Sequence, residues 1–246
     1  MRFLYHLGRY AILMSRSIKK PEKQKVFWNR VLIEIDKLGV NSIGIVLIIS
    51  VFVGAVLALQ AAFNMDTPWI PDYAVGLTTR QAIILEFSPT IISVILAGKV
   101  GSSIASEIGS MRISEQIDAM EIMGVNPASF LIAPKMIAAV IINPFLITLS
   151  MAVSMFGGWL GALVSNALTG DLYIFGIKSF FELYDVFYAL FKTAIFAFII
   201  TSVSAYYGYY VNGGSIEVGH SSTRAVVSSS ILIIFANLIL TQLMLT

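Results

Sequence analysis

Long apolar stretches without charges constrain the fold of this chain more than any other feature. Asn41–Met65 has no ionisable side chain, and neither has Ala225–Thr246. At 1.5 Å per residue, a helix of either length can cross roughly 30 Å of hydrocarbon. The whole chain is 57% hydrophobic and 12% charged, whereas soluble domains carry about 25% charged residues. We therefore predict an all-α integral membrane protein.

Five such stretches predict five transmembrane helices within a single domain over 1–246. Their expected bounds are about 41–65, 81–106, 136–165, 186–211 and 225–246. The third is the least obvious, because Met136–Gly170 runs for 35 residues without a charge. That exceeds one perpendicular crossing of about 20 residues but leaves almost no turn for two crossings. Since Pro144 and Gly157 can kink a helix, we interpret this stretch as one long, tilted span.

Residues 1–40 form a basic segment that holds nine of the sixteen Lys and Arg residues. On a helix, Arg2, Arg9 and Arg16 fall on one side. The apolar residues on the opposite face are Phe3, Leu4, Leu7, Tyr10, Ala11, Met14 and Ile18. This pattern predicts an amphipathic helix in the membrane plane with its arginines on lipid phosphates. A cleaved signal peptide fits less well, since a long unbroken apolar core is missing.

The distribution of cations also predicts the topology. An excess of Lys and Arg beside the first span places the N-terminal segment in the cytoplasm. Five crossings from a cytoplasmic start then leave the C-terminus outside.

Between the second and third spans lies the polar stretch Ala105–Pro127, whose middle predicts a short helix over about 114–124. Ser114 is the expected N-cap, with Glu115 in the first turn, and Gly124 is a stop signal. The apolar stripe of this helix consists of Ile113, Ile117 and Met120. A helix this short is marginal alone in water, so we expect it to dock on something. A plain surface connection with a solvated acidic face fits the spacing equally well.

The second span contains two ionisable residues, Glu86 and Lys99. A charge at the centre of a bilayer costs about 2.5–3.5 kcal/mol on translocon scales, so such residues tend to face protein or water. Lys99 is close enough to the cytoplasmic end to snorkel. Glu86 is either an interfacial carboxylate near the outer end or a polar group that lines a cavity. The fourth span carries Lys192 in its first half.

The loops offer little chemistry. Asp66–Arg80 has the aromatic and turn-rich character of an outer interface, and Asp171–Asp185 predicts an outer helix at the interface. Asn212–Arg224 predicts a cytoplasmic loop rich in Gly and Ser, without a phosphate-binding motif.

The sequence also lacks the residues that catalysis or metal binding would need. There is no Cys, and His6 and His220 are the two His residues, so we expect no metal or other cofactor.

With no catalytic arrangement visible, the energy for any work must come from a partner or an ion gradient. A gradient-driven carrier would need several acids or His residues in midspan. A partner ATPase that pushes on the short helix fits better, because that helix can transmit rigid-body motion to both adjoining spans. A membrane scaffold that transports nothing is a third possibility.

The stretch EIGSMRISEQIDAMEIMGVNP (Glu107–Pro127) closely resembles the signature of the MlaE/YrbE-type permeases, the membrane subunits of MCE-associated ABC transporters. The resemblance extends over most of the chain. It includes GAVLALQ (Gly54–Gln60), LEFSPTIISVILAGKVGSSIASE (Leu85–Glu107), the Lys-containing Phe191–Thr193 and GHSSTRAVVSSS (Gly219–Ser230).

This resemblance implies a five-span permease that works as a homodimer in the bacterial inner membrane, has no catalytic activity and moves phospholipid between inner and outer membranes. It implies a cytoplasmic ABC ATPase and a periplasmic MCE-domain protein as partners, with no role for nucleic acid. The connector would be the coupling helix that contacts the ATPase through Glu115, Gln116, Asp118 and Glu121. A lipid cavity would be lined by Glu86, with Leu85 and Phe87 beside it and Gln60 on the first span.

One departure from the family pattern concerns lipid binding. Related sequences can carry an Arg immediately before the acid, whereas Leu85 stands there in this chain. A cavity without that cation would hold a lipid phosphate less well, so headgroup specificity does not follow from the resemblance. Lys99 lies 13 residues beyond Glu86, about 20 Å along a helix, and cannot replace that cation within one subunit.

Overall fold

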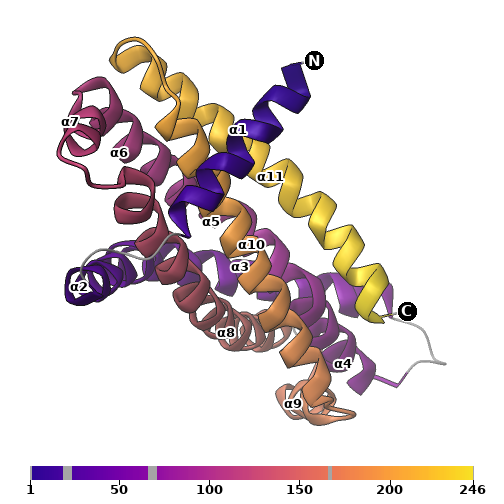
Figure 1. Cartoon of the computed structure of the whole chain (residues 1–246). Coiled ribbons are helices and arrows are strands. Elements are labelled where there is room, and N and C mark those ends of the chain that lie inside the picture. Colours follow the sequence, from indigo (N-terminus) through magenta and orange to yellow (C-terminus); the bar gives the residue numbers. More distant parts are fainter. Residues whose placement is uncertain (1, 19–23, 66–70, 166–167, 246) are drawn as a thin grey trace. The chain divides into compact units, whose positions relative to one another are not determined.

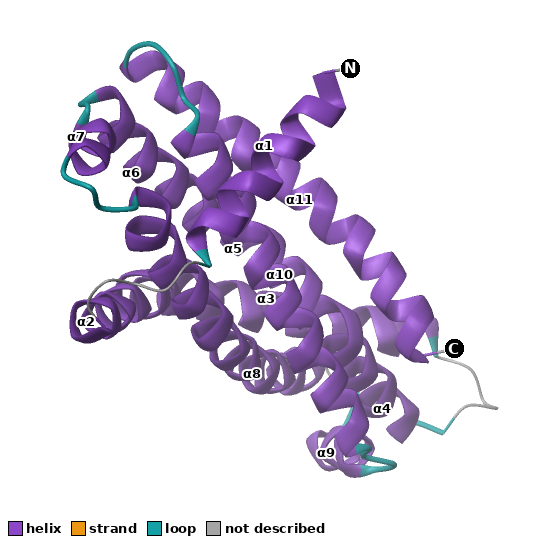
Figure 2. Ribbon diagram, viewed as in Figure 1, coloured by secondary structure: helices purple, strands orange, loops and turns teal. Residues whose placement is uncertain are grey.

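The computed structural model describes residues 2–18, 24–65, 71–165 and 168–245, and every regular element in these ranges is helical (Figure 1, Figure 2). The α-helices are α1 (Arg2–Ser17), α2 (Gln24–Ile35), α3 (Asn41–Asn64), α4 (Tyr73–Ala82), α5 (Ile92–Leu96), α6 (Ser102–Ile113), α7 (Gln116–Ile122), α8 (Ala133–Val164), α9 (Gly170–Lys178), α10 (Leu183–Tyr209) and α11 (Ser215–Leu245). Short π-helical segments lie between some of them: η1 (Asp36–Val40), η2 (Ile83–Ile91), η3 (Ala97–Gly101) and η4 (Ala128–Ile132).

Joined through these π-helical segments, the elements make five helices that are long and apolar enough to cross a membrane. They cover Gln24–Asn64, Tyr73–Ile113, Ala128–Val164, Leu183–Tyr209 and Ser215–Met244. The prediction of an all-helical chain with five apolar spans is confirmed at this level. Most of the long charge-free stretch, up to Val164, belongs to the single helix α8, which continues through Pro144.

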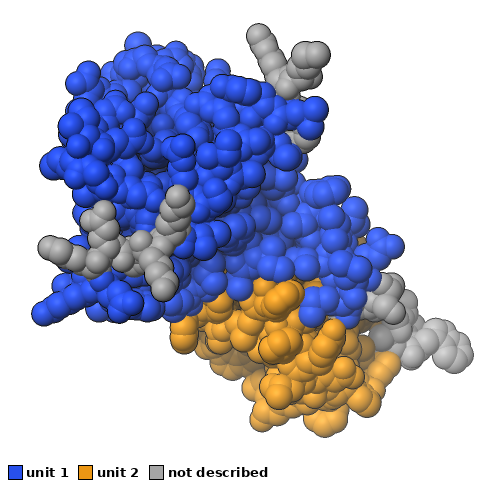
Figure 3. All heavy atoms as spheres, viewed as in Figure 1, with its two compact units in different colours: residues 1–41, 94–143, 194–246 blue, residues 42–93, 144–193 orange. Residues whose placement is uncertain are grey.

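The chain forms two compact units, coloured separately in Figure 3. Unit 1 comprises residues 1–41, 94–143 and 194–246, and unit 2 comprises residues 42–93 and 144–193.

In unit 1, α6 packs along α11 through small residues. A Cβ placed on Gly109 of α6 would lie 3.1 Å from the side chain of Val218 on α11. The hydroxyl of Ser222 donates to the carbonyl of Ser102 at 3.2 Å. Helix backbones approach this closely where side chains are small.

The Gly- and Ser-rich loop predicted over residues 212–224 is wrong for most of its length, because α11 already begins at Ser215. Serine disfavours a helix interior when its hydroxyl competes for nearby backbone groups. Here the hydroxyl of Ser221 instead donates to the carbonyl of Tyr207 on α10 at 2.6 Å. Tertiary contact therefore overrides the local preference for a loop.

In unit 2, α3 and α8 pack backbone against backbone. A Cβ on Gly54 would lie 1.8 Å from the carbonyl oxygen of Ser154, and one on Gly157 would lie 2.2 Å from that of Val51. Gly44, on the same helix, has no neighbour within 4 Å of a built Cβ. The close approach thus involves the part of α3 around Val51 and Gly54 and does not extend to Gly44.

The outer helix expected over Asp171–Asp185 is split in the structure. α9 ends at Lys178, and α10 begins at Leu183 after a short turn. α9 packs on α4 through facing glycines: a Cβ on Gly176 would lie 2.1 Å from the Tyr73 carbonyl oxygen. Tyr173 of α9 is fully buried, and burial raises the pKa of its hydroxyl, which therefore stays protonated.

Candidate functional site

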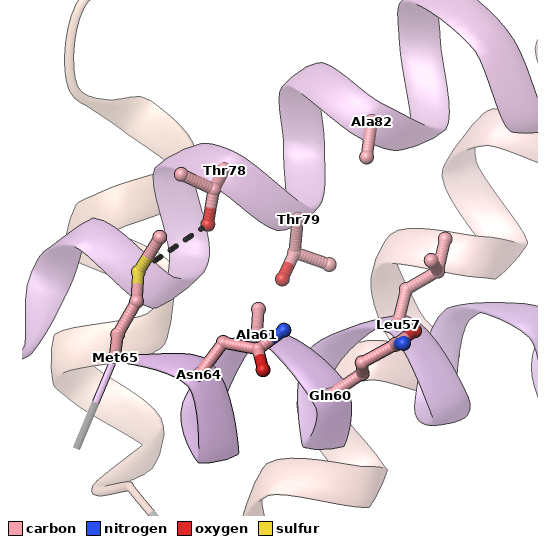
Figure 4. Close-up of a pocket in the computed structure, with 8 residues that line it drawn as sticks. All are labelled: Leu57, Gln60, Ala61, Asn64, Met65, Thr78, Thr79 and Ala82. Atoms are coloured by element: carbon pink, nitrogen blue, oxygen red, sulfur yellow. Dashed lines mark hydrogen bonds between the residues drawn. The ribbon is translucent and has the colours of Figure 1, made fainter.

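A pocket of about 230 Å³ lies between α3 and α4 of unit 2 (Figure 4). Its lining consists of Leu57, Gln60, Ala61, Asn64, Met65, Thr78, Thr79 and Ala82. Gln60 was predicted to line a lipid cavity, and the structure places it in this pocket. The lining combines apolar side chains with amides and hydroxyls but contains no charged group, so it suits the neutral part of an amphipathic molecule.

Thr79 contributes a polar atom that lacks a partner within the described part of the chain. The residue is 1% exposed, and its hydroxyl is buried without a hydrogen bond. Figure 4 shows the Thr79 side chain directed toward α3, on the side of Ala61. The neighbouring Thr78 hydroxyl, by contrast, donates to the Ala74 carbonyl at 2.9 Å. A buried hydroxyl without a partner costs free energy, so Thr79 offers the pocket an unused hydrogen-bonding group.

Glu86 follows Ala82 by four residues along the same continuous helix and pairs with Lys192 of α10. The Lys192 ammonium lies 3.0 Å from the Glu86 carboxylate and also donates to the Leu85 carbonyl at 3.0 Å. The hydroxyl of Thr90 donates to the other carboxylate oxygen at 3.3 Å. The Lys192 side chain is completely buried, whereas that of Glu86 is 40% exposed. An incoming molecule would therefore meet the carboxylate first.

The backbone around Glu86 is irregular. The π-helical segment η2 covers Ile83–Ile91 and contains Pro89, which cannot donate a helical hydrogen bond. π-helical turns are frequent at functional sites because they re-aim side chains. Leu85 and Phe87, the predicted neighbours in a cavity, are half-buried in this segment. With Glu86, they lie outside the lining of the Gln60 pocket as described.

Lys192 is the residue that sequence reasoning missed. Its presence inside an apolar span was a signal, since an ionisable residue there is expected to have a partner. The partner could not be inferred, because Glu86 is 106 positions away in the chain. The pair supplies a cation where Leu85 had suggested none.

The connector between the second and third spans contains α7, which is shorter than predicted and begins differently. Ser114 ends α6, and its hydroxyl donates back to the Ser110 carbonyl at 2.8 Å, so the predicted N-cap is wrong. Glu115 occupies the cap position instead, with φ 59 in the left-handed region. This backbone reversal, which few side chains favour, separates α7 from α6.

The expected stop at the other end of α7 is confirmed. Gly124 has φ 81, its N–H donates to the Glu121 carbonyl at 3.0 Å, and the Val125 N–H donates to the Met120 carbonyl at 3.0 Å. These two bonds form a Schellman motif, which glycine permits because it lacks a Cβ.

The four predicted coupling residues divide into two pairs. Glu115 and Gln116 are exposed. Asp118 forms an ion pair with Arg112 of α6 at 2.5 Å, and Glu121 accepts a hydrogen bond from the Tyr209 hydroxyl at 2.9 Å. The first pair is available to a partner, whereas the second helps to hold α7 in place.

An apolar tip at the end of α7 was not predicted. Ile122 is 88% exposed and Met123 is 70% exposed, while Ile117 on the inner face is completely buried. Exposed apolar side chains that lie together can mark a contact with a protein or a membrane. The helical periodicity had drawn attention only to the inner stripe.

Behind the connector, four charged side chains of unit 1 form a network. Lys135 of α8 pairs with Glu34 of α2 at 2.5 Å and with Glu107 of α6 at 3.0 Å. Glu107 also pairs with Lys37 at 2.5 Å. Lys135 is 3% exposed. The network ties the helix that precedes α7 to two other helices of the same unit.

The three arginines expected on lipid phosphates have different surroundings. Arg2 begins α1, but its side chain lies outside the described part. Arg16 is exposed. The Arg9 guanidinium stands 3.8 Å from the ring centre of Tyr210 at the end of α10, a cation–π contact within the protein. α1 also bonds to α10 through His6 and Tyr206, whose Nδ1 and hydroxyl atoms are 2.6 Å apart (Figure 1).

Comparison with known proteins gives a consistent result. Residues 31–243 match the family described as permease MlaE. The chain is 31% identical to a probable ABC transporter permease protein of Rickettsia typhi, over 99% of this chain and 94% of the relative. It is 30% identical to the intermembrane phospholipid transport system permease protein MlaE of Haemophilus influenzae, over 98% and 93%. It is also 30% identical to protein TRIGALACTOSYLDIACYLGLYCEROL 1 of Arabidopsis thaliana, over 94% and 66%. With five apolar helices and a family match over most of its length, the chain belongs to the MlaE permease family of ABC transporters.

Proposed function

We propose that this protein moves phospholipid between the inner and outer membranes, driven by a separate ATPase chain. Membership of the MlaE permease family supports the ABC transporter part of this proposal, and the name of the Haemophilus influenzae relative supports the phospholipid part. The permease itself performs no ATP hydrolysis in this scheme. It supplies the lipid path and the surface on which the ATPase acts.

The observation that carries the proposal is the Glu86–Lys192 ion pair inside apolar helices, one turn beyond the Gln60 pocket. Ionisable residues within a membrane-spanning segment are costly and often mark the path of a polar substrate. A zwitterionic phospholipid headgroup offers an ammonium, complementary to the partly exposed carboxylate of Glu86, while the buried Lys192 holds that carboxylate in place. The adjoining uncharged pocket suits the glycerol and ester region, with the unpartnered hydroxyl of Thr79 as a hydrogen-bonding group.

Two segments connect this site to the rest of the transporter. The ATPase contacts the exposed face of α7, formed by Glu115, Gln116, Ile122 and Met123, while Asp118 and Glu121 hold α7 against α6 and α10. The charged network around Lys135 passes the resulting motion to α2 and α8, since packed helices move as rigid elements.

The assembly we propose is a homodimer in the bacterial inner membrane that meets a periplasmic MCE-domain protein. The N-terminus lies in the cytoplasm and the C-terminus in the periplasm. Arg2 and Arg16 of α1 face lipid phosphates, whereas Arg9 anchors α1 to the protein through Tyr210.

Photo-crosslinking tests the lipid site directly. The complex, with a photoactivatable phospholipid, is compared as wild type, Glu86→Gln, Lys192→Met and the control Glu182→Gln, which alters an exposed carboxylate on the turn before α10. We expect crosslinking to fall for the first two variants and to persist in the control. Unchanged crosslinking in both site variants would show that the ion pair does not bind lipid.

A further inference from the structure

Arg80 of α4 fixes the turn that joins α9 to α10 in unit 2. Its guanidinium donates to the carbonyls of Ile177 at 2.8 Å, Ser179 at 2.7 Å and Phe180 at 3.0 Å. The residue is 1% exposed, and none of the ion pairs found among the described residues involves it. The last carbonyls of a helix carry the negative end of its dipole. The buried cation is therefore stabilised by the end of α9 and by the turn itself.

The clamped turn holds Phe180 in an unfavourable backbone conformation. Its φ is 52, in the left-handed region that bulky side chains rarely adopt. Strain of this kind persists where the surroundings over-determine the backbone, and it is found where a protein presents a group for function. Here the three hydrogen bonds from Arg80 supply the constraint.

The conformation turns two aromatic rings outward. Phe180 is 76% exposed and Phe181 is 53% exposed. The patch continues along one side of α10, where Leu183 is 76%, Phe187 63% and Phe191 46% exposed. Residues four apart lie on one face of a helix. The turn is thus the end of a continuous apolar stripe on a membrane-spanning helix.

The length of α10 indicates the depth of the turn. The helix has 27 residues, or about 40 Å at 1.5 Å per residue, which exceeds the ~30 Å hydrocarbon layer but matches the ~40–45 Å that includes the headgroups. The turn before Leu183 therefore falls at the level of the headgroups. Exposed Lys178 and Glu182 flank the rings and suit that polar layer, while Phe180 and Phe181 can reach the acyl chains beneath it.

We propose that Phe180 and Phe181 form an aromatic wedge that inserts into the lipid leaflet at this end of α10, with Arg80 as the positioning residue. The lipid bilayer is the occupant we infer, because the wedge is continuous with the exposed apolar stripe of α10, a helix long and apolar enough to cross a membrane. α4 carries Arg80 and also the pocket residues Thr78 and Thr79, so the wedge sets the depth of that pocket in the leaflet. This last consequence rests on the proposed lipid transport, whereas the insertion does not.

Fluorescence of a single tryptophan tests the wedge in the full chain. Trp28, Trp69 and Trp159 are replaced by Phe, and Phe180→Trp is introduced, which keeps a bulky ring at the strained position. The protein is reconstituted in phosphatidylcholine liposomes with plain or brominated acyl chains. We expect emission to be lost with brominated chains and to resist aqueous acrylamide. Ile122→Trp, at the 88% exposed tip of α7, is the control expected to show the reverse.

Two outcomes would overturn the proposal. Quenching of Phe180→Trp by acrylamide as strong as that of the control would place the ring in water. Resistance to both quenchers would mean that a second copy or another protein surface covers it. Phe181→Trp provides a second probe at an unstrained position if the first variant does not fold.

The role of Arg80 has its own measurement. Adding Arg80→Gln to the Phe180→Trp protein should reduce the loss of emission with brominated chains, because the turn is no longer clamped. An unchanged loss would remove Arg80 from the proposal. None of these readouts depends on transport, so failure of the wedge and failure of the proposed function can be told apart.

Discussion

Among single residues, burial distinguishes two lysines that share one carboxylate. Lys135 and Lys37 both pair with Glu107, but their side chains are 3% and 44% exposed. Lys135 also forms an ion pair with Glu34, whose second carboxylate oxygen is buried without a hydrogen bond. We expect Lys135→Met to destabilise the protein by about 3 kcal/mol or more, since it leaves the largely buried carboxylate of Glu34 without its ion pair, and Lys37→Met to cost about 1 kcal/mol or less. Unfolding of both variants in the same detergent measures this difference, and equal losses would contradict it.

Only the residue types at the site could be predicted from the sequence, and not their partners. Glu86 stood out because an ionisable residue within an apolar span can be recognised in the sequence alone, whereas Gln60 was implied only by the family resemblance. The pairing of Glu86 with Lys192 was not, since it joins residues that are far apart in the chain. The burial and pairing of Lys135 were not predicted either, because a buried, paired lysine cannot be distinguished in the sequence from a solvated one.

Between elements, glycine decides how closely helices approach. Gly176 of α9 faces α4 with no room for a Cβ, whereas Gly44 of α3 has open space around it. Gly176→Ala should therefore destabilise unit 2 by about 1–3 kcal/mol through overpacking. Gly44→Ala should stabilise it by up to about 1 kcal/mol, because alanine is the better helix former. Thermal unfolding of the two variants in detergent checks the opposite signs, and a loss for both would refute this account of α4 and α9.

The elements themselves were only partly predictable. Five long helices could be predicted from hydropathy, because a helix that crosses a bilayer must be long and apolar whatever its tertiary contacts. Their ends did not follow, since these depend on contacts: Ser221 continues α11 by bonding to Tyr207. The residues around Ser114 suggested that it was an N-cap. In the structure, Ser114 is the C-cap of α6 instead, and its hydroxyl donates to the carbonyl of Ser110.

At the scale of the whole molecule, the absence of native Cys makes the topology directly testable. Ile122→Cys on α7 should react with a membrane-impermeant maleimide only after the inner membrane is opened, because the connector lies in the cytoplasm in our proposal. Glu182→Cys, on the exposed turn before α10, should react once the outer membrane is opened. Labelling of Ile122→Cys under that milder condition would place the connector in the periplasm and exclude an ATPase contact there.

The assembly with its ATPase should depend on the apolar tip of α7. Ile122→Glu combined with Met123→Glu places two charges where we propose a protein contact, and neither change touches the buried Ile117 that seats α7. A buried charge without a partner opposes association, so the ATPase should be lost on co-purification while the permease still inserts. Phe175→Glu, a matched change at a 58% exposed site on α9, should retain it. If the double variant keeps both the ATPase and its lipid-stimulated hydrolysis, α7 is not the surface through which this permease is driven.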